Sequence, residues 1–115
     1  MKQEDNSKYL KFLNENKKLV GLSDWKITIS KKYLDDGNFA EVEPNIYEKE
    51  LEVTLSKQFY GLQHVRKKNV LLHELIHGRV EIFNKRKEQI VEELEEDMVN
   101  DITRGFERHK PLTWE

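Results

Sequence analysis

The first part of the chain carries apolar residues at helical spacing. This pattern predicts a helix over residues 7–20. Ser7 is of the residue types that cap helix N-termini, and Gly21 suits the left-handed position that follows a last turn. The predicted buried face of this helix consists of Tyr9, Leu10, Leu13, the aliphatic stem of Lys17, and Val20.

Three segments with strand character follow. Residues 25–30 and 51–55 alternate apolar and polar side chains, and this alternation predicts two half-buried strands. Residues 39–42 between them also look extended, and residues 35–38 predict the turn before them. Because Pro44 cannot donate a hydrogen bond to a neighbouring strand, we expect this middle strand to lie at an edge of the sheet or to stop there.

From Leu62 onward the apolar period is that of a helix. The centre of this helix, residues 70–77, is apolar on nearly every side, which predicts that it is buried. We expect a short turn at residues 84–87 and then a last helix over residues 88–106, with Pro111 marking its outer limit. The predicted apolar stripes are Leu62, Val65, Asn69, Leu72, Ile76, Val80 and Phe83 on the first helix, and Val91, Leu94, Met98, Ile102 and Phe106 on the last.

The order of these elements is one helix, three strands and then two helices, which predicts an α+β fold. A chain of 115 residues is long enough for one hydrophobic core but not for two, so we expect a single domain over residues 1–115. Charged residues and apolar residues each make up 37% of the chain, and the net charge is −2. Together with the apolar periodicity, this balance predicts a folded domain with a heavily charged surface.

Composition also argues against several classes of partner and site. The near-neutral charge argues against a nucleic-acid partner, and the basic runs at 66–68 and 85–87 have acidic residues nearby. The chain has no cysteine, so disulfides and thiolate metal sites are excluded. The N-terminus lacks the apolar core of a signal peptide, and no segment is apolar enough to span a bilayer. We therefore expect a cytoplasmic protein with no membrane partner.

One motif carries recognisable chemistry. Residues 73–77 read His-Glu-Leu-Ile-His, which is the H-E-x-x-H pattern. On a helix, His73 and His77 lie one turn apart on the same face, so their imidazoles can converge on one metal ion. Glu74 lies one step round the helix, where it can reach a water on the metal without being a ligand. Because buried imidazoles need polar partners, we favour a metal site over two histidines that are hydrogen-bonded or lie at the surface.

A catalytic zinc site needs a third protein ligand and an open fourth position. The longer motif that supplies a third histidine from the same helix is excluded, because Val80 and Phe83 occupy its glycine and histidine positions. Glu81 lies about 12 Å along the helix axis from the first histidine of the motif, which is too far for a shared tetrahedral ion. We expect His64 and His109 to be surface histidines.

The acidic run 92–97 on the last helix supplies the remaining candidates for the third ligand. We favour Glu96, because Asn100 follows it by one turn and could hydrogen-bond a ligating histidine. Glu93 and Glu92 stay open as alternatives, and most of the run is expected to be a solvated acidic face, although Glu95 lies within the apolar face.

These residues resemble a minimal gluzincin, with H-E-x-x-H on one helix and a ligating glutamate on the next. The segment 96–103 is similar to the E-x-x-A-N-x-F-A segment of ImmA/IrrE-type peptidases and to the E-x-x-S-D segment of thermolysin-like enzymes, with Val99 in place of the small residue. The layout also resembles the small zincin-like proteins of phages and mobile elements. The resemblance covers residues 25–106 in outline, and only 73–77 and 96–100 are specific.

The resemblance implies a zincin-like α+β fold with a three-stranded, mostly antiparallel sheet. It implies a zinc metallopeptidase in which His73, His77 and Glu96 bind Zn²⁺ and Glu74 is the general base. The expected partner is a peptide or protein substrate, which the edge strand near residues 39–47 could hold by β-addition. Candidates for a further donor to the oxyanion are Tyr47, Tyr60 and His64.

Two other readings compete with the peptidase. The site could hold zinc in a non-catalytic regulatory or interaction protein with a zincin-like fold, or the chain could be a metal-free interaction protein. Structural zinc sites usually fill all four positions with protein ligands, and only three ligands are visible here. The sequence therefore favours an open, catalytic site.

Overall fold

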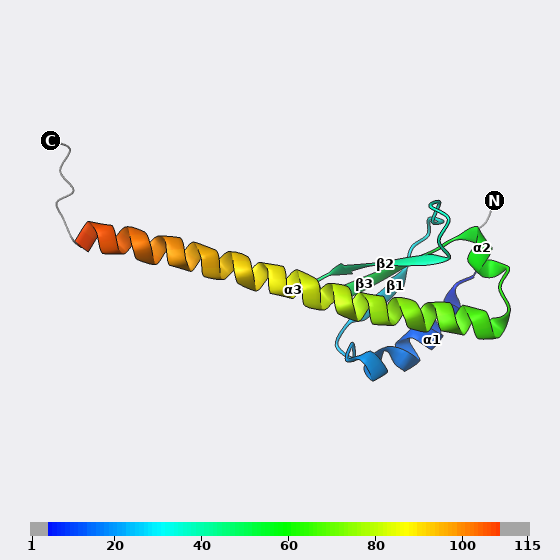
Figure 1. The fold of residues 1–115 in the computed structure, drawn as a ribbon. Coiled ribbons are helices and arrows are strands. Elements are labelled where there is room, and N and C mark those ends of the chain that lie inside the picture. The colour runs from blue at the N-terminus through cyan, green and yellow to red at the C-terminus, as the bar shows by residue number, and fades with distance from the viewer. Residues whose placement is uncertain (1–4, 109–115) are drawn as a thin grey trace. The chain divides into compact units, whose positions relative to one another are not determined.

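The computed structural model describes residues 5–108, and their side chains as far as Asp101. The predicted α+β class is confirmed, and no helix in this range is long and apolar enough to cross a membrane. His109, Pro111 and the side chains of Ile102 and Phe106 lie outside the described part. In chain order the elements are α1 (Ser7–Asn16), the 3₁₀ helix η1 (Lys17–Val20), β1 (Lys26–Ile29), β2 (Ala40–Asn45), β3 (Glu50–Leu55), α2 (Lys57–Tyr60) and α3 (His64–Arg108) (Figure 1).

The chain divides into two compact units, Met1–Phe83 and Asn84–Glu115. The first unit holds the sheet, the short helices and the beginning of α3. In the second unit, every side chain from residue 90 to residue 101 is exposed. The buried core of the described chain therefore lies in the first unit, and the prediction of a single domain over residues 1–115 stays a prediction.

The sheet is mixed, with the strand order β1-β3-β2. β1 pairs with β3 in parallel, and β2 pairs with β3 antiparallel. The prediction of a mostly antiparallel sheet is therefore wrong for one of the two pairings. Alternation of apolar and polar residues shows which side of a strand is buried, but it does not show which neighbour a strand takes or in which direction.

β2 lies at one edge of the sheet, as Pro44 predicts, and it continues through the proline to Asn45. The amide of Ser56 donates to the carbonyl of Phe39 over 2.9 Å, so the backbone groups of Phe39 point toward β3. Along an antiparallel strand, the backbone groups of successive residues point alternately toward and away from the neighbouring strand. Those of Pro44 therefore point away from β3. Its missing N–H therefore removes no bond between these strands.

The core of the first unit lies on one face of the sheet. Leu51, Val53 and Leu55 alternate along β3 and are almost completely buried. Side chains from α1 and α3 cover this face, and Figure 1 shows both helices running alongside the strands. The helical members of this core are Tyr9 and Leu13 of α1, Phe59 of α2, and Leu71, Leu75 and Ile82 of α3.

The prediction of which side of α3 is buried is wrong. The predicted stripe includes Ile76, Val80 and Phe83, which are 54%, 50% and 59% exposed. The buried side instead runs through Leu71, Leu75 and Ile82, with Gly78 between them, so this helix is not buried all round. Because its centre is apolar on nearly every side, the sequence pattern alone could not select one face.

Gly78 decides which face of α3 meets the sheet. A Cβ atom at this position would lie 2.9 Å from both terminal methyl carbons of Leu51. The absence of a side chain thus lets the helix backbone approach β3 more closely than any other residue would allow. This close approach fixes the rotation of α3 about its axis, and so the side on which the preceding His73 and His77 lie.

The predicted turn at residues 84–87 is also wrong, because these residues are helical within α3. The segment contains neither glycine nor proline, and its lysines and arginine are good helix formers. Basic residues in a row are typical of a solvated surface, but they do not interrupt a helix.

Smaller features follow the sequence with shifts of one or two residues. Gly21 and Gly37 have the positive φ angles of 76° and 86° that the predicted helix end and turn require. Asn6 rather than Ser7 is the N-cap residue of α1.

The short helix α2 was not predicted. Its N-cap is Ser56, whose hydroxyl accepts a hydrogen bond from the amide of Phe59 over 3.2 Å.

Candidate metal and peptide site

The H-E-x-x-H motif lies within α3 in the first unit, and its two imidazoles face one another. The Nε2 atoms of His73 and His77 are 2.8 Å apart, and their ring centroids are 4.3 Å apart. At this distance one ring nitrogen donates to the other, and the tautomers decide which is the donor. Both side chains are exposed, so the expectation that these imidazoles are buried is wrong, although an ion from solvent can reach them.

The arrangement of the two imidazoles fits a zinc ion. With Zn–N distances of about 2.0–2.1 Å and a tetrahedral angle, two ligating nitrogens lie about 3.3 Å apart. The Nε2 atoms of His73 and His77, now 2.8 Å apart, would therefore need to separate by about half an ångström. Changes of this size require only small side-chain rotations.

Glu74 lies beside the histidines and is largely buried, with 8% of its surface exposed. Burial raises the pKa of its carboxyl group above the ordinary value, because the charged form loses solvation. The nearby His77 acts in the opposite direction and the carboxylate of Glu41 adds to the increase, but burial is the largest cause.

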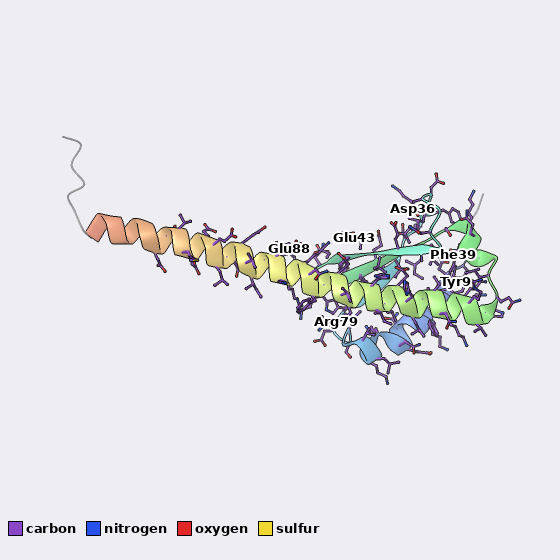
Figure 2. The ribbon with its side chains drawn as sticks, viewed as in Figure 1. Tyr9, Asp36, Phe39, Glu43, Arg79 and Glu88 are labelled. Atoms are coloured by element: carbon purple, nitrogen blue, oxygen red, sulfur yellow. The ribbon has the colours of Figure 1, made fainter. Side chains whose placement is uncertain are left out.

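These three residues lie in an open groove of about 720 Å³ between β2 and α3. This volume is in the range of small-molecule and peptide sites. Figure 2 marks Phe39, which lines the groove, and Asp36 in the loop before β2. The groove is lined by Asn38, Phe39, Ala40, Glu41 and Val42 on the sheet side and by Arg66, Asn69, Val70, His73, Glu74, His77 and Glu81 on α3.

The groove follows the strand edge, and α3 runs in the same direction as β2. At one end the guanidinium of Arg66 lies 5.9 Å from the ring centroid of Phe39. In the middle, Glu74 is close enough to Glu41 to feel its charge. Further along, Gly78 approaches Leu51, which is the register partner of Pro44.

The backbone of β2 supplies hydrogen-bonding groups along this groove. By the antiparallel alternation, the N–H and C=O groups of Ala40 and Val42 point away from β3. No backbone partner for them occurs within residues 5–108. Unpaired groups on an edge strand are a template for a further strand.

Glu41, which lines the groove, shares a hydrogen bond with the carboxyl group of Asp36, which does not. This bond lowers the pKa of Asp36 and raises the pKa of Glu41, so Glu41 is the partner that retains the proton more readily. The amide of Asn38 also donates to Asp36 over 3.0 Å, which favours the ionised form of Asp36.

The predicted third ligand lies in the second unit. Glu96 and its alternatives Glu93 and Glu92 are exposed residues of α3 there. Within the part of the chain that the structure describes, no three His, Asp or Glu side chains form a group that could hold a metal. The structure thus brings His73, His77 and Glu74 together, and the role of Glu96 stays a prediction.

The three candidates for an additional oxyanion donor do not line the groove. Tyr47 is 83% exposed in the turn after β2. The hydroxyl of Tyr60 donates to the side-chain oxygen of Asn6 over 2.6 Å, and His64 lines a different, smaller pocket. Of the polar groove residues on α3, only Arg66 and Asn69 precede the histidines.

Sequence reasoning missed Arg66, Asn69, Phe39 and Glu41 as residues of the site. A signal for the first two was available, because they precede His73 by seven and four residues and so share its side of a helix. The edge strand near residues 39–47 was expected to hold a substrate, but no spacing in the sequence assigns Phe39 or Glu41 a place opposite the histidines.

Comparisons with protein-family models, with curated proteins and with solved structures found no match for this chain. Its function is therefore argued from the geometry of the groove.

Proposed function

We propose that this protein is a zinc-dependent peptidase of the gluzincin type. In this proposal His73 and His77 bind Zn²⁺ and Glu74 is the general base, while the assignment of Glu96 as the third ligand stays a prediction from the sequence. The observation that carries the proposal is the 2.8 Å approach of the two Nε2 atoms beside a buried carboxylate in an open groove. Two convergent imidazoles are a common zinc-ligand pair, and a free groove is what a substrate requires.

The chemistry assigned to Glu74 follows from its environment. Zinc would supply a Lewis acid that makes a water more acidic and polarises a peptide carbonyl. Glu74 would accept a proton from the attacking water and pass it to the departing amine. A carboxylate with a raised pKa suits this transfer, because a general base works best when its pKa approaches the working pH.

The substrate would bind along the free edge of β2. An extended peptide can exchange hydrogen bonds with the outward-facing groups of Ala40 and Val42, adding a strand to the sheet. The residues facing that edge from α3 include His73, Glu74 and His77, so a peptide held there would cross the metal site.

Three variants test the roles of these residues. In Glu74→Gln, zinc content is expected to stay near one per chain while cleavage of internally quenched peptides falls by 10²-fold or more, on the order of the effect of a lost general base. In His77→Ala, both zinc binding and cleavage should be lost. Glu96→Ala tests the sequence prediction of the third ligand: zinc affinity should fall by about 10-fold or more if Glu96 is a ligand, and unchanged affinity would show that it is not.

His64→Ala is the matched control, because His64 is a histidine of α3 outside the groove. It should keep zinc and turnover. Full cleavage by Glu74→Gln would contradict the enzymatic proposal. If the wild type binds zinc as Glu74→Gln does and cleaves no peptide, that result would instead favour a non-catalytic zinc-binding protein.

A further inference from the structure

We propose that the groove selects peptides by charge, through Arg66 at one end and Glu81 at the other. The preferred peptide carries an acidic residue on the C-terminal side of the cleaved bond and a basic residue on the N-terminal side. This inference rests on the proposed function for the cleaved bond, but it also concerns peptide binding alone.

The two charges are available to a ligand. Arg66 and Glu81 are exposed, both line the groove, and neither forms an ion pair with any residue in the described range. Arg66 is held near the ring of Phe39 and so is positioned at its end of the groove. A guanidinium in this position can bind a carboxylate through two parallel hydrogen bonds.

The direction of a bound peptide follows from the strand it would join. Antiparallel pairs are slightly more stable per residue than parallel pairs, so we assign the antiparallel direction. β2 and α3 run in the same direction, with Arg66 beside the start of β2. An antiparallel peptide therefore places its C-terminal part at Arg66 and its N-terminal part at Glu81.

Helix geometry sets which peptide positions meet the two charges. Along the axis of α3, Arg66 lies about 12 Å before Glu74 and Glu81 about 10 Å after it. An extended peptide advances by about 3.3 Å per residue, and long side chains shorten the required span. Each charge should therefore act on the second to fourth residue from the cleaved bond.

The other charges in the groove do not oppose this assignment. Glu41 lies near the middle of the groove, close to Glu74, where it shares a hydrogen bond with Asp36. Asp36 itself does not line the groove. The opposite charges at the two ends of the groove are thus those of Arg66 and Glu81.

The test compares two eight-residue peptides with the same uncharged centre. One has Lys toward its N-terminus and Glu toward its C-terminus, and the other has these charges exchanged. Binding is measured by fluorescence anisotropy on the Glu74→Gln protein, and cleavage is measured on the wild-type zinc protein. The first peptide is expected to bind about tenfold more tightly and to be cleaved with about tenfold higher kcat/KM, with two exposed charge pairs each contributing a few-fold.

Charge reversal at both ends should invert the preference. The double variant Arg66→Glu/Glu81→Lys is expected to favour the exchanged peptide by about tenfold, and each single variant should reduce the wild-type preference to about none. Lys68→Glu is the control, because this nearby exposed lysine does not line the groove, and it should leave the preference unchanged. The preference should also weaken as salt is added.

The outcomes separate this inference from the proposed function. Cleavage of both peptides at equal rates would overturn the charge assignment and leave the peptidase intact. A clear binding preference without cleavage would overturn the proposal that the protein is a peptidase and would support the charge-selective binding of peptides in the groove. A preference for the exchanged peptide in the wild type would overturn the antiparallel direction, and absence of both binding and cleavage would overturn both proposals.

Discussion

At the level of single residues, Glu74 combines two properties that are unfavourable together. It is a carboxylate with only 8% of its surface exposed, on the side of α3 that meets the sheet. No hydrogen bond or ion pair to it occurs among the described residues, although the charge of His77 favours its ionised form. Proteins seldom keep such a group unless it has a chemical role, so its burial supports its assignment as a base.

The raised pKa of Glu74 predicts how the metal-free protein responds to pH. A carboxyl whose pKa is raised by folding binds its proton more readily in the folded than in the unfolded chain. Stability should therefore fall as pH rises from the ordinary value of 4.5 through the raised pKa, and then remain lower. Glu74→Gln removes this loss, so at pH 7 in chelator it should unfold at a higher denaturant concentration than the wild type.

The gain in stability from Glu74→Gln should shrink as pH falls toward 4, where the wild-type carboxyl is increasingly protonated in both the folded and the unfolded chain. Glu81→Gln is the matched control, because Glu81 lies in the same groove but is exposed. It should change stability little at either pH. A Glu74→Gln protein that is less stable than the wild type at pH 7 would contradict the assignment of a burial cost to this residue.

At the level of elements, the contact between α3 and β3 depends on one glycine. Gly78→Ala would place a methyl group 2.9 Å from both methyl carbons of Leu51, which is completely buried. Overpacking of this kind costs about 1–3 kcal/mol. Alanine is the better helix former by about 1 kcal/mol, so we expect a net loss of about 1 kcal/mol. In thermal unfolding this corresponds to about 4–8 °C.

Gly61→Ala provides the comparison, because a Cβ atom there would meet nothing closer than the carbonyl of Gln58 at 3.5 Å. Gly61→Ala should leave the midpoint of thermal unfolding unchanged or raise it slightly. Combining Gly78→Ala with Leu51→Val should cost less than the sum of the two single changes, since the smaller side chain makes room. Strict additivity would show that the methyl group does not meet Leu51.

The extent to which these elements were predictable follows from what each pattern encodes. Strand alternation located β1 and β3, and Pro44 indicated the edge, because these signals are local. The parallel pairing of β1 with β3 depends on contacts between distant residues, which one sequence does not show. The buried side of α3 was misassigned because Ile76 and Val80 are as apolar as Leu71 and Leu75, and only the approach at Gly78 distinguishes the two faces.

The candidate site was predictable only where its residues share one helix. The motif gave His73, Glu74 and His77, because a spacing of four residues fixes their common side. The groove depends on β2 lying beside α3, so the sequence could suggest the edge strand near residues 39–47 as a substrate site but not the individual roles of Glu41 and Phe39. The same limit applies to Glu96, whose assignment as a ligand rests on Asn100 one turn later and on the resemblance, and not on a contact in the structure.

At the level of the whole molecule, the two units differ in what holds them folded. The first unit has a continuous core that extends along α3 to Ile82. In the second unit the side chains from 90 to 101 are exposed, including Ile90, Leu94 and Met98. Helices without tertiary packing are marginal in water, so this segment should exchange its amide protons faster than the first part of α3.

A truncation after Lys87 tests how far function depends on the second unit. The shortened chain keeps the whole core of the first unit, and its last turn carries basic residues that suit a helix C-terminus. We expect its metal-free melting midpoint to lie within about 5 °C of the full chain, because none of the removed side chains that the structure describes, 88–101, is buried. Zinc affinity, measured by competition with a chelating dye, should fall by about tenfold or more if a carboxylate beyond residue 87 is the third ligand. Restoring the full chain with Glu96→Ala should reproduce this loss, whereas Glu93→Ala should not. If the shortened chain binds zinc as tightly as the full one, the third ligand lies within the first unit or is water, and Glu96 has no part in the site.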